Sequence, residues 1–122
     1  MNVALWICQL LLALVFLFSG VTKSTQPVAR LVASGQTGVE GLPRGLVCFI
    51  GICELFGVAG LVLPWALQTF PVLTPSAAAA LGIIMVLAAR VHVRRREYRT
   101  AAANLVLLTL CVTVAVGRFR AL

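Results

Sequence analysis

One acidic side chain stands alone in a long apolar stretch, and acidic groups in such places commonly bind ligands or transfer protons. Residues 45–89 carry a single charge, that of Glu54. A carboxyl near the bilayer midplane costs about 2.5 kcal/mol or more to insert, so it is protonated, paired or directed at a polar cavity. Gly51 and Gly57 lie at helical spacing from it and mark a packed face. We therefore expect Glu54 to point into a helical bundle as a candidate catalytic acid or base, with a structural hydrogen bond as the alternative.

The cations nearest to Glu54 are Lys23, Arg44 and Arg90. Each is expected at the cytoplasmic boundary, about 13–15 Å from Glu54 along the helix axis by helical rise. That separation is too large for a direct ion pair. We therefore expect Glu54 to be protonated rather than paired.

The other candidates are the few polar groups within or beside the apolar stretches. His92 is the one histidine, and it is a candidate proton-entry group, with a plain interfacial residue as the alternative. One histidine and four cysteines without zinc spacing predict no metal site. Simple hydrogen bonding between helices is the alternative for each of the candidate ligand-binding residues, which are Gln9, Ser19, Asn104 and Thr109.

The elements that must position these groups are membrane-spanning helices. The chain is 61% hydrophobic and 11% charged, which excludes an ordinary soluble domain. A crossing needs about 20 mostly apolar residues, so residues 45–89 hold two crossings. The sequence thus predicts an all-α, integral membrane four-helix bundle, a single membrane domain over residues 1–122. The spans are expected at about 3–21, 45–63, 74–91 and 100–117, with Pro64 ending the second.

A signal peptide is the alternative for the first span, but that stretch lacks a basic start and a small-residue cleavage site. Residues 24–44 form the longest loop. Within it, Pro27 suits a first helical position and Gly35 a position past a helix end, so residues 27–34 predict a short interfacial helix, with a turn as the alternative. Ala78 and Gly82 form a small-residue pair that predicts close packing inside the bundle or against a second copy.

The charge of +7 indicates topology and contact with membrane lipids rather than nucleic acid, because the basic residues flank the spans. Two of the ten, Arg118 and Arg120, belong to the side that holds both termini. The positive-inside rule therefore places the two loops in the cytoplasm and both termini outside. The loop side holds the other eight, which are Lys23, Arg30, Arg44, Arg90, Arg94, Arg95, Arg96 and Arg99.

Four segments, taken in order, resemble the DoxX-like family of small four-helix integral membrane proteins. They are residues 16–23 (FLFSGVTK), 50–57 (IGICELFG), 88–92 (AARVH) and 104–107 (NLVL). The family is named for a membrane subunit associated with thiosulfate oxidation and quinone reduction. The resemblance implies a multi-pass protein of the bacterial inner membrane that holds a lipophilic molecule, such as a quinone-like compound, near Glu54, or supports a membrane redox complex.

The partners implied are a lipophilic small molecule, a redox partner subunit or a second copy of the chain. Two alternatives to this function stay open. The first is an acid–base isomerase, cyclase or epoxide-opening enzyme that acts on a lipophilic substrate through Glu54. The second is a non-catalytic scaffold subunit of a membrane complex.

Overall fold

Four long apolar helices make up most of the molecule. In the computed structural model, which describes residues 2–122, they are α1 (Asn2–Thr25), α3 (Arg44–Leu67), α4 (Leu73–Arg94) and α5 (Tyr98–Arg120). Each is long and apolar enough to cross a membrane. Large apolar side chains point outward from them, as Phe56 does with 74% of its surface exposed. Outward apolar side chains suit a lipid environment, so the structure confirms the all-α membrane bundle.

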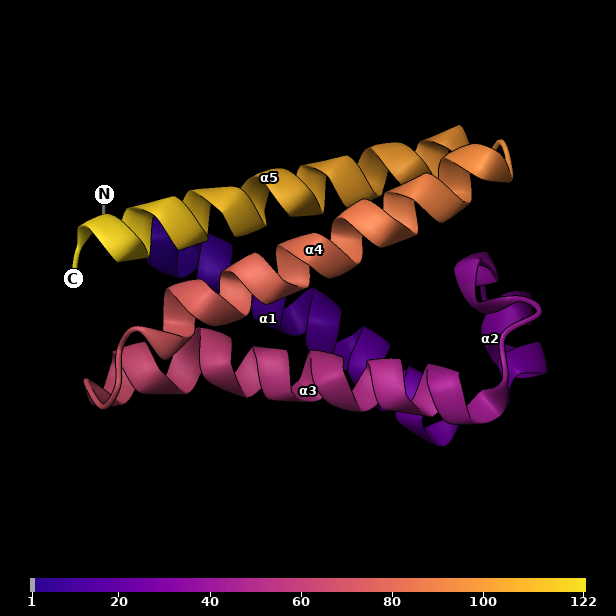
Figure 1. The fold of residues 1–122 in the computed structure, drawn as a ribbon, viewed down its shortest axis with the longest axis horizontal. Helices are drawn as coiled ribbons and strands as arrows, with labels where there is room; N and C mark the ends of the chain where they lie inside the picture. Colours follow the sequence, from indigo (N-terminus) through magenta and orange to yellow (C-terminus); the bar gives the residue numbers. More distant parts are fainter. Residues whose placement is uncertain (1) are drawn as a thin grey trace.

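The helices are arranged as two pairs. α1 packs on α3, and α4 packs on α5. Figure 1 shows both chain ends at one end of the bundle, and α2 (Val28–Ala33) at the other end with the α4–α5 hairpin. A 3-10 turn, η1 (Thr37–Val39), follows α2. The short helix predicted between the first two spans is therefore confirmed.

The core lies where the two pairs meet. Leu12 and Phe16 of α1 are buried there against Leu81 of α4 and Val114 of α5. On α4, Ala78 and Gly82 are also buried. A methyl group at Gly82 would lie 3.5 Å from the Cβ atom of Cys111. The predicted small-residue face therefore packs inside the bundle, against α5.

Every long helix extends beyond the span predicted for it, and the largest error concerns Pro64. We expected the second span to end there, whereas α3 continues through Pro64 to Leu67. A proline inside a helix has no N–H to donate and leaves a carbonyl of the preceding turn without its partner. Such a helix persists in a membrane when neighbouring side chains supply the missing donors.

Two side chains from other helices donate hydrogen bonds to α3 at this turn. The hydroxyl of Thr74, at the start of α4, donates to the Gly60 carbonyl at 3.1 Å, which is the acceptor that Pro64 leaves free. The amide of Gln9, from α1, donates to the next carbonyl, that of Leu61, at 2.8 Å. Tertiary contacts therefore stabilise the helix beyond the proline, and the local sequence gives no indication of them.

Substitution Thr74→Val is expected to destabilise the protein by about 1–2 kcal/mol, because it leaves the half-buried Gly60 carbonyl without a donor. Equilibrium unfolding in mixed micelles measures the change. Ser76→Ala is the control on the same helix turn, because the Ser76 hydroxyl is exposed. In a Pro64→Leu background the backbone N–H of residue 64 serves Gly60, so Thr74→Val should cost clearly less. An equal cost in both backgrounds would contradict this account.

Candidate functional site

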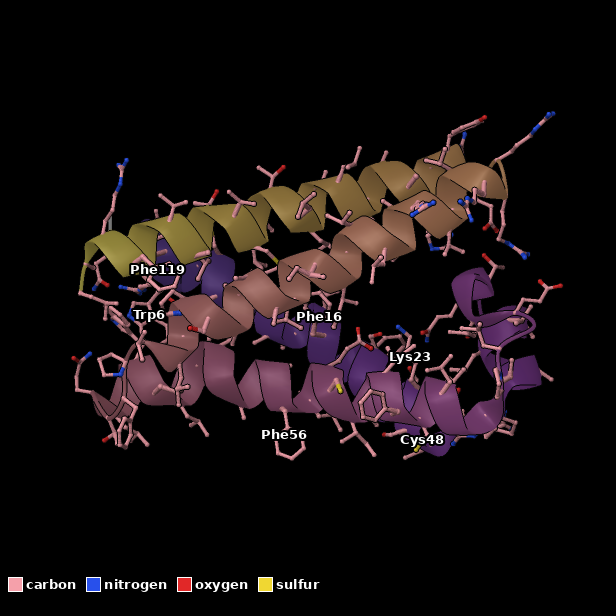
Figure 2. All side chains as sticks on the ribbon, viewed as in Figure 1. Trp6, Phe16, Lys23, Cys48, Phe56 and Phe119 are labelled. Carbon is pink, nitrogen blue, oxygen red and sulfur yellow. The ribbon has the colours of Figure 1, made fainter. Side chains whose placement is uncertain are left out.

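The site begins with a close approach of α1 and α3 that two glycines permit. A methyl group at Gly51 would lie 2.8 Å from the Cβ atom of Lys23 and 2.9 Å from the Gly20 carbonyl oxygen, so only glycine fits. Lys23 therefore lies opposite Gly51, about 10 Å into α3 by helical rise. Arg44 stabilises this arrangement from the start of α3, because its guanidinium donates to the Lys23 carbonyl at 2.9 Å. Figure 2 shows Lys23 in the half of the bundle that holds α2.

Glu54 is fully buried one helical turn further along α3. The Lys23 Nζ atom lies 3.1 Å from its Oε1 atom. The Ser19 hydroxyl hydrogen-bonds to the same carboxylate, at 3.0 Å from Oε1. The expectation that Glu54 has no cation partner was wrong. Helical rise gave only the distance along one helix from Glu54 to the expected end of the span. Lys23 lies on the neighbouring helix, α1, opposite Gly51, and its side chain extends toward Glu54.

A cavity of about 530 Å³ adjoins this ion pair, between the two helix pairs. Its volume falls within the range of small-molecule sites, about 300–1,000 Å³. Most of its walls are apolar. Lining residues come from all four long helices and from the loop around η1, and they include Phe16, Ser19, Lys23, Gly38, Cys53, Glu54, Met85, Ala88, His92, Asn104 and Leu107. This lining suits a mostly apolar molecule that carries only a few polar groups.

Asn104 lines the cavity from α5, across from the α1–α3 pair that holds Glu54 and Lys23. Only 9% of its surface is exposed. Within residues 2–122, its Nδ2 atom is buried without a hydrogen-bond partner. Buried amides are nearly always hydrogen-bonded, so this one is available to a ligand or a water molecule.

His92 joins the cavity to the loop that covers its α2 end. Its Nδ1 atom lies 3.1 Å from the Glu97 carboxylate, and its ring packs against Gly38 of η1. The Thr37 hydroxyl also donates to Glu97. Thr37 and then His92 hold the pKa of Glu97 below its ordinary value. His92 therefore ties the η1 loop to the α4–α5 hairpin while its ring remains on the cavity wall.

A salt bridge strengthens the same contact between the η1 loop and the α4–α5 hairpin. Arg95 donates to Glu40, just after η1, at 2.8 Å, and to Glu97 at 3.1 Å. Glu40 and then Glu97 raise the pKa of the Arg95 guanidinium. Both pairs are partly exposed, so each contributes little stability on its own. Together with Thr37 they fix where the loop lies over the cavity.

Gln9 and Thr109 do not line the cavity. Gln9 is buried near the other end of the bundle, where its amide oxygen accepts from the Arg118 guanidinium at 2.6 Å. Arg118 is 2% exposed and lies over the Trp65 ring, 4.5 Å from its centroid. Thr109 is exposed, and its hydroxyl donates to the Leu105 carbonyl of its own helix. Gln9 therefore joins helices, and Thr109 faces outward.

Sequence reasoning rejected Lys23 as a partner of Glu54, and it did not single out Cys53. The sequence does contain one feature that indicates a role for Lys23 beside a polar partner. Ser19 and Lys23 are four residues apart and share a helix face, and Gly20 lies beside them. Only the position of Gly51 opposite Gly20 turns that face toward Glu54. Cys53 lines the cavity as a free cysteine, and no pattern in the sequence distinguishes it from the others.

The fold and these contacts define a multi-pass membrane protein of four helices with an ion pair beside a half-open cavity. Comparison with protein-family models matches residues 7–114 to the DoxX-like family. Because the match covers most of the 122 residues, the chain belongs to the DoxX-like family. Comparisons with curated proteins and with solved structures gave no match.

Proposed function

We propose that this protein binds a lipophilic small molecule in the cavity, with an oxygen function of that molecule beside Lys23 and Glu54. The observation that carries the proposal is a mostly apolar cavity of about 530 Å³ with a buried ion pair in its wall. Lys23 retains donors beyond the one that Glu54 uses, and the carboxylate can accept a further hydrogen bond. An alcohol, phenol or carbonyl oxygen fits such a pair. A quinone-like compound, which the family resemblance implied, is one ligand of this kind.

The test is to fill the cavity. Ala88 of α4 lines it, and Ala88→Phe should eliminate the space without adding charge. We expect native mass spectrometry of the purified wild-type protein to detect one small lipophilic compound that Ala88→Phe has lost. Ala80→Phe is the control, because Ala80 is exposed on the same helix outside the cavity. Retention of the same compound by Ala88→Phe would contradict binding at this site and favour the scaffold role, in a redox complex or another assembly.

An acid–base isomerase, cyclase or epoxide-opening enzyme is the second candidate, and the ion pair itself favours it. The pair holds a proton acceptor, the Glu54 carboxylate, and a proton donor, the Lys23 ammonium, 3.1 Å apart on the cavity wall. Glu54→Gln keeps the size and hydrogen bonding of the side chain but cannot accept a proton. An enzyme therefore predicts that Glu54→Gln retains the bound compound and never converts it. Conversion by Glu54→Gln at the wild-type rate would exclude this candidate.

We also propose that the α2–η1 loop and the α4–α5 hairpin face the cytoplasm of a bacterial cell and that both termini face outward. The excess of Lys and Arg at the loop end supports this orientation. Arg118 is buried, so Arg120 is the exposed basic residue of the last turn. The difference in exposed positive charge between the loop end and the end with the termini is therefore larger than the sequence alone indicates.

Reporter fusions test the orientation. A reporter that is active only in the cytoplasm should give no signal after Leu122, and one that is active only outside should give a strong signal there. The reversed pattern would show that the termini are cytoplasmic. Fusion of the same two reporters between Arg95 and Arg96 is the internal control and should give the opposite result.

A further inference from the structure

Asn104 is the one lining residue of the cavity whose side-chain nitrogen is buried without a partner in the part of the chain that the structure describes. More than nine-tenths of the residue is buried. Its position is also separate from the ion pair. Asn104 belongs to α5, whereas Lys23 and Glu54 belong to α1 and α3, the opposite helix pair. The cavity therefore has polar groups on both helix pairs, and apolar side chains such as Phe16 and Met85 also line it.

We propose that Asn104 is a specificity-determining residue and that the ligand carries two separated oxygen functions. One oxygen lies beside Lys23 and Glu54, and the other hydrogen-bonds to the Asn104 amide from the opposite wall. The proposal rests on the proposed function and goes further, because it defines the ligand class as a lipophilic compound with two oxygens rather than one. Rotation of the amide about its terminal torsion costs little, so it turns either its N–H or its oxygen toward the ligand.

Two arguments support a ligand in preference to packing alone. A side chain retained only for packing would be apolar, because a buried amide without a partner costs free energy that leucine of similar size would avoid. Asn104 also differs from the nearby polar groups of α5. The hydroxyls of Thr109 and Thr113 are bonded to backbone carbonyls of their own helix, at 2.9 Å and 2.8 Å. No such internal acceptor serves the Asn104 nitrogen among residues 2–122.

The composition of the chain makes a direct test simple. It contains two asparagines, Asn2 and Asn104. Protein labelled with 15N-asparagine therefore gives two pairs of side-chain amide signals in the spectrum, one pair from each residue. Asn2 lies at the other end of the bundle, where its oxygen accepts from Arg118, so it is an internal control. The probes are decalin-1,5-dione, which carries two carbonyl oxygens, and decalin, which carries none.

We expect the dione to shift the Asn104 amide signals and to leave the Asn2 signals in place, whereas decalin should move those of Asn104 much less. We also expect Asn104→Leu to raise the Kd of the dione about fivefold to tenfold, the effect of one lost hydrogen bond. The Kd of decalin should change less than about twofold, because leucine keeps the size of the side chain. Thr109→Val, on the same helix and outside the cavity, should leave both constants unchanged.

The outcomes separate this proposal from the one on which it rests. If the dione binds and Ala88→Phe abolishes binding, but the Asn104 signals and the Kd of Asn104→Leu do not change, the role of Asn104 is wrong and the binding function stands. If neither probe binds to the wild-type protein, both proposals fail. Equal weakening of dione and decalin in Asn104→Leu would show a steric effect and would also overturn the role of Asn104.

Discussion

Substitution Lys23→Met is expected to destabilise the bundle by about 3 kcal/mol, the typical cost of removing one partner of a buried ion pair. The physical reason is the position of Glu54, which is fully buried and keeps only the Ser19 hydroxyl when the ammonium is gone. Lys23 has 16% of its side chain exposed, so solvent screens the pair only slightly. Equilibrium unfolding in mixed micelles measures the loss.

A double variant tests the cause of that loss. Replacing both partners, as Lys23→Met with Glu54→Leu, removes the uncompensated charge and should recover most of the stability. Arg90→Met is the matched control, because Arg90 is exposed at the end of α4, and it should change stability by less than about 0.5 kcal/mol. If the double variant is no more stable than Lys23→Met alone, the pair does not account for the effect.

The second large effect is expected from Gly51→Ala, which should cost about 2–3 kcal/mol through overpacking. The added methyl would lie 2.8 Å from the backbone nitrogen of Ser24 and 2.9 Å from the Gly20 carbonyl. Backbone atoms of a packed helix cannot rotate away as a side-chain tip does, so α1 and α3 must separate. Their separation would also draw Lys23 away from Glu54, which adds to the cost.

Gly82→Ala is the control for Gly51→Ala. Gly82 is buried between α4 and α5, but its nearest neighbours would lie 3.5 Å from the new methyl, an ordinary contact. Alanine also favours a helix over glycine by about 0.8–1.0 kcal/mol, so this variant should be neutral or stabilised. Comparable losses in the two variants would indicate a general intolerance of alanine and would contradict the account of the α1–α3 contact.

The number of helices and their membrane character follow from the sequence, whereas the helix ends do not. Hydropathy marks where the chain leaves the hydrocarbon, and this is why the first span was expected to stop near residue 21. Backbone hydrogen bonding continues beyond that point, to Thr25. At Pro64 the local rule failed for a different reason, because Thr74 and Gln9 supply hydrogen bonds from other helices.

The sequence by itself determined which residues are candidates for chemistry: a lone carboxyl in an apolar stretch is expensive wherever the helices lie, and that cost identifies Glu54. Only the tertiary structure decided how the candidates are grouped. It joins Glu54 to Lys23 and Ser19, brings His92 and Asn104 to the same cavity, and leaves Gln9 and Thr109 elsewhere. The reason is that grouping depends on how far one helix is shifted along another. In this protein the contact of Gly20 with Gly51 sets that shift, and it involves residues far apart in the chain.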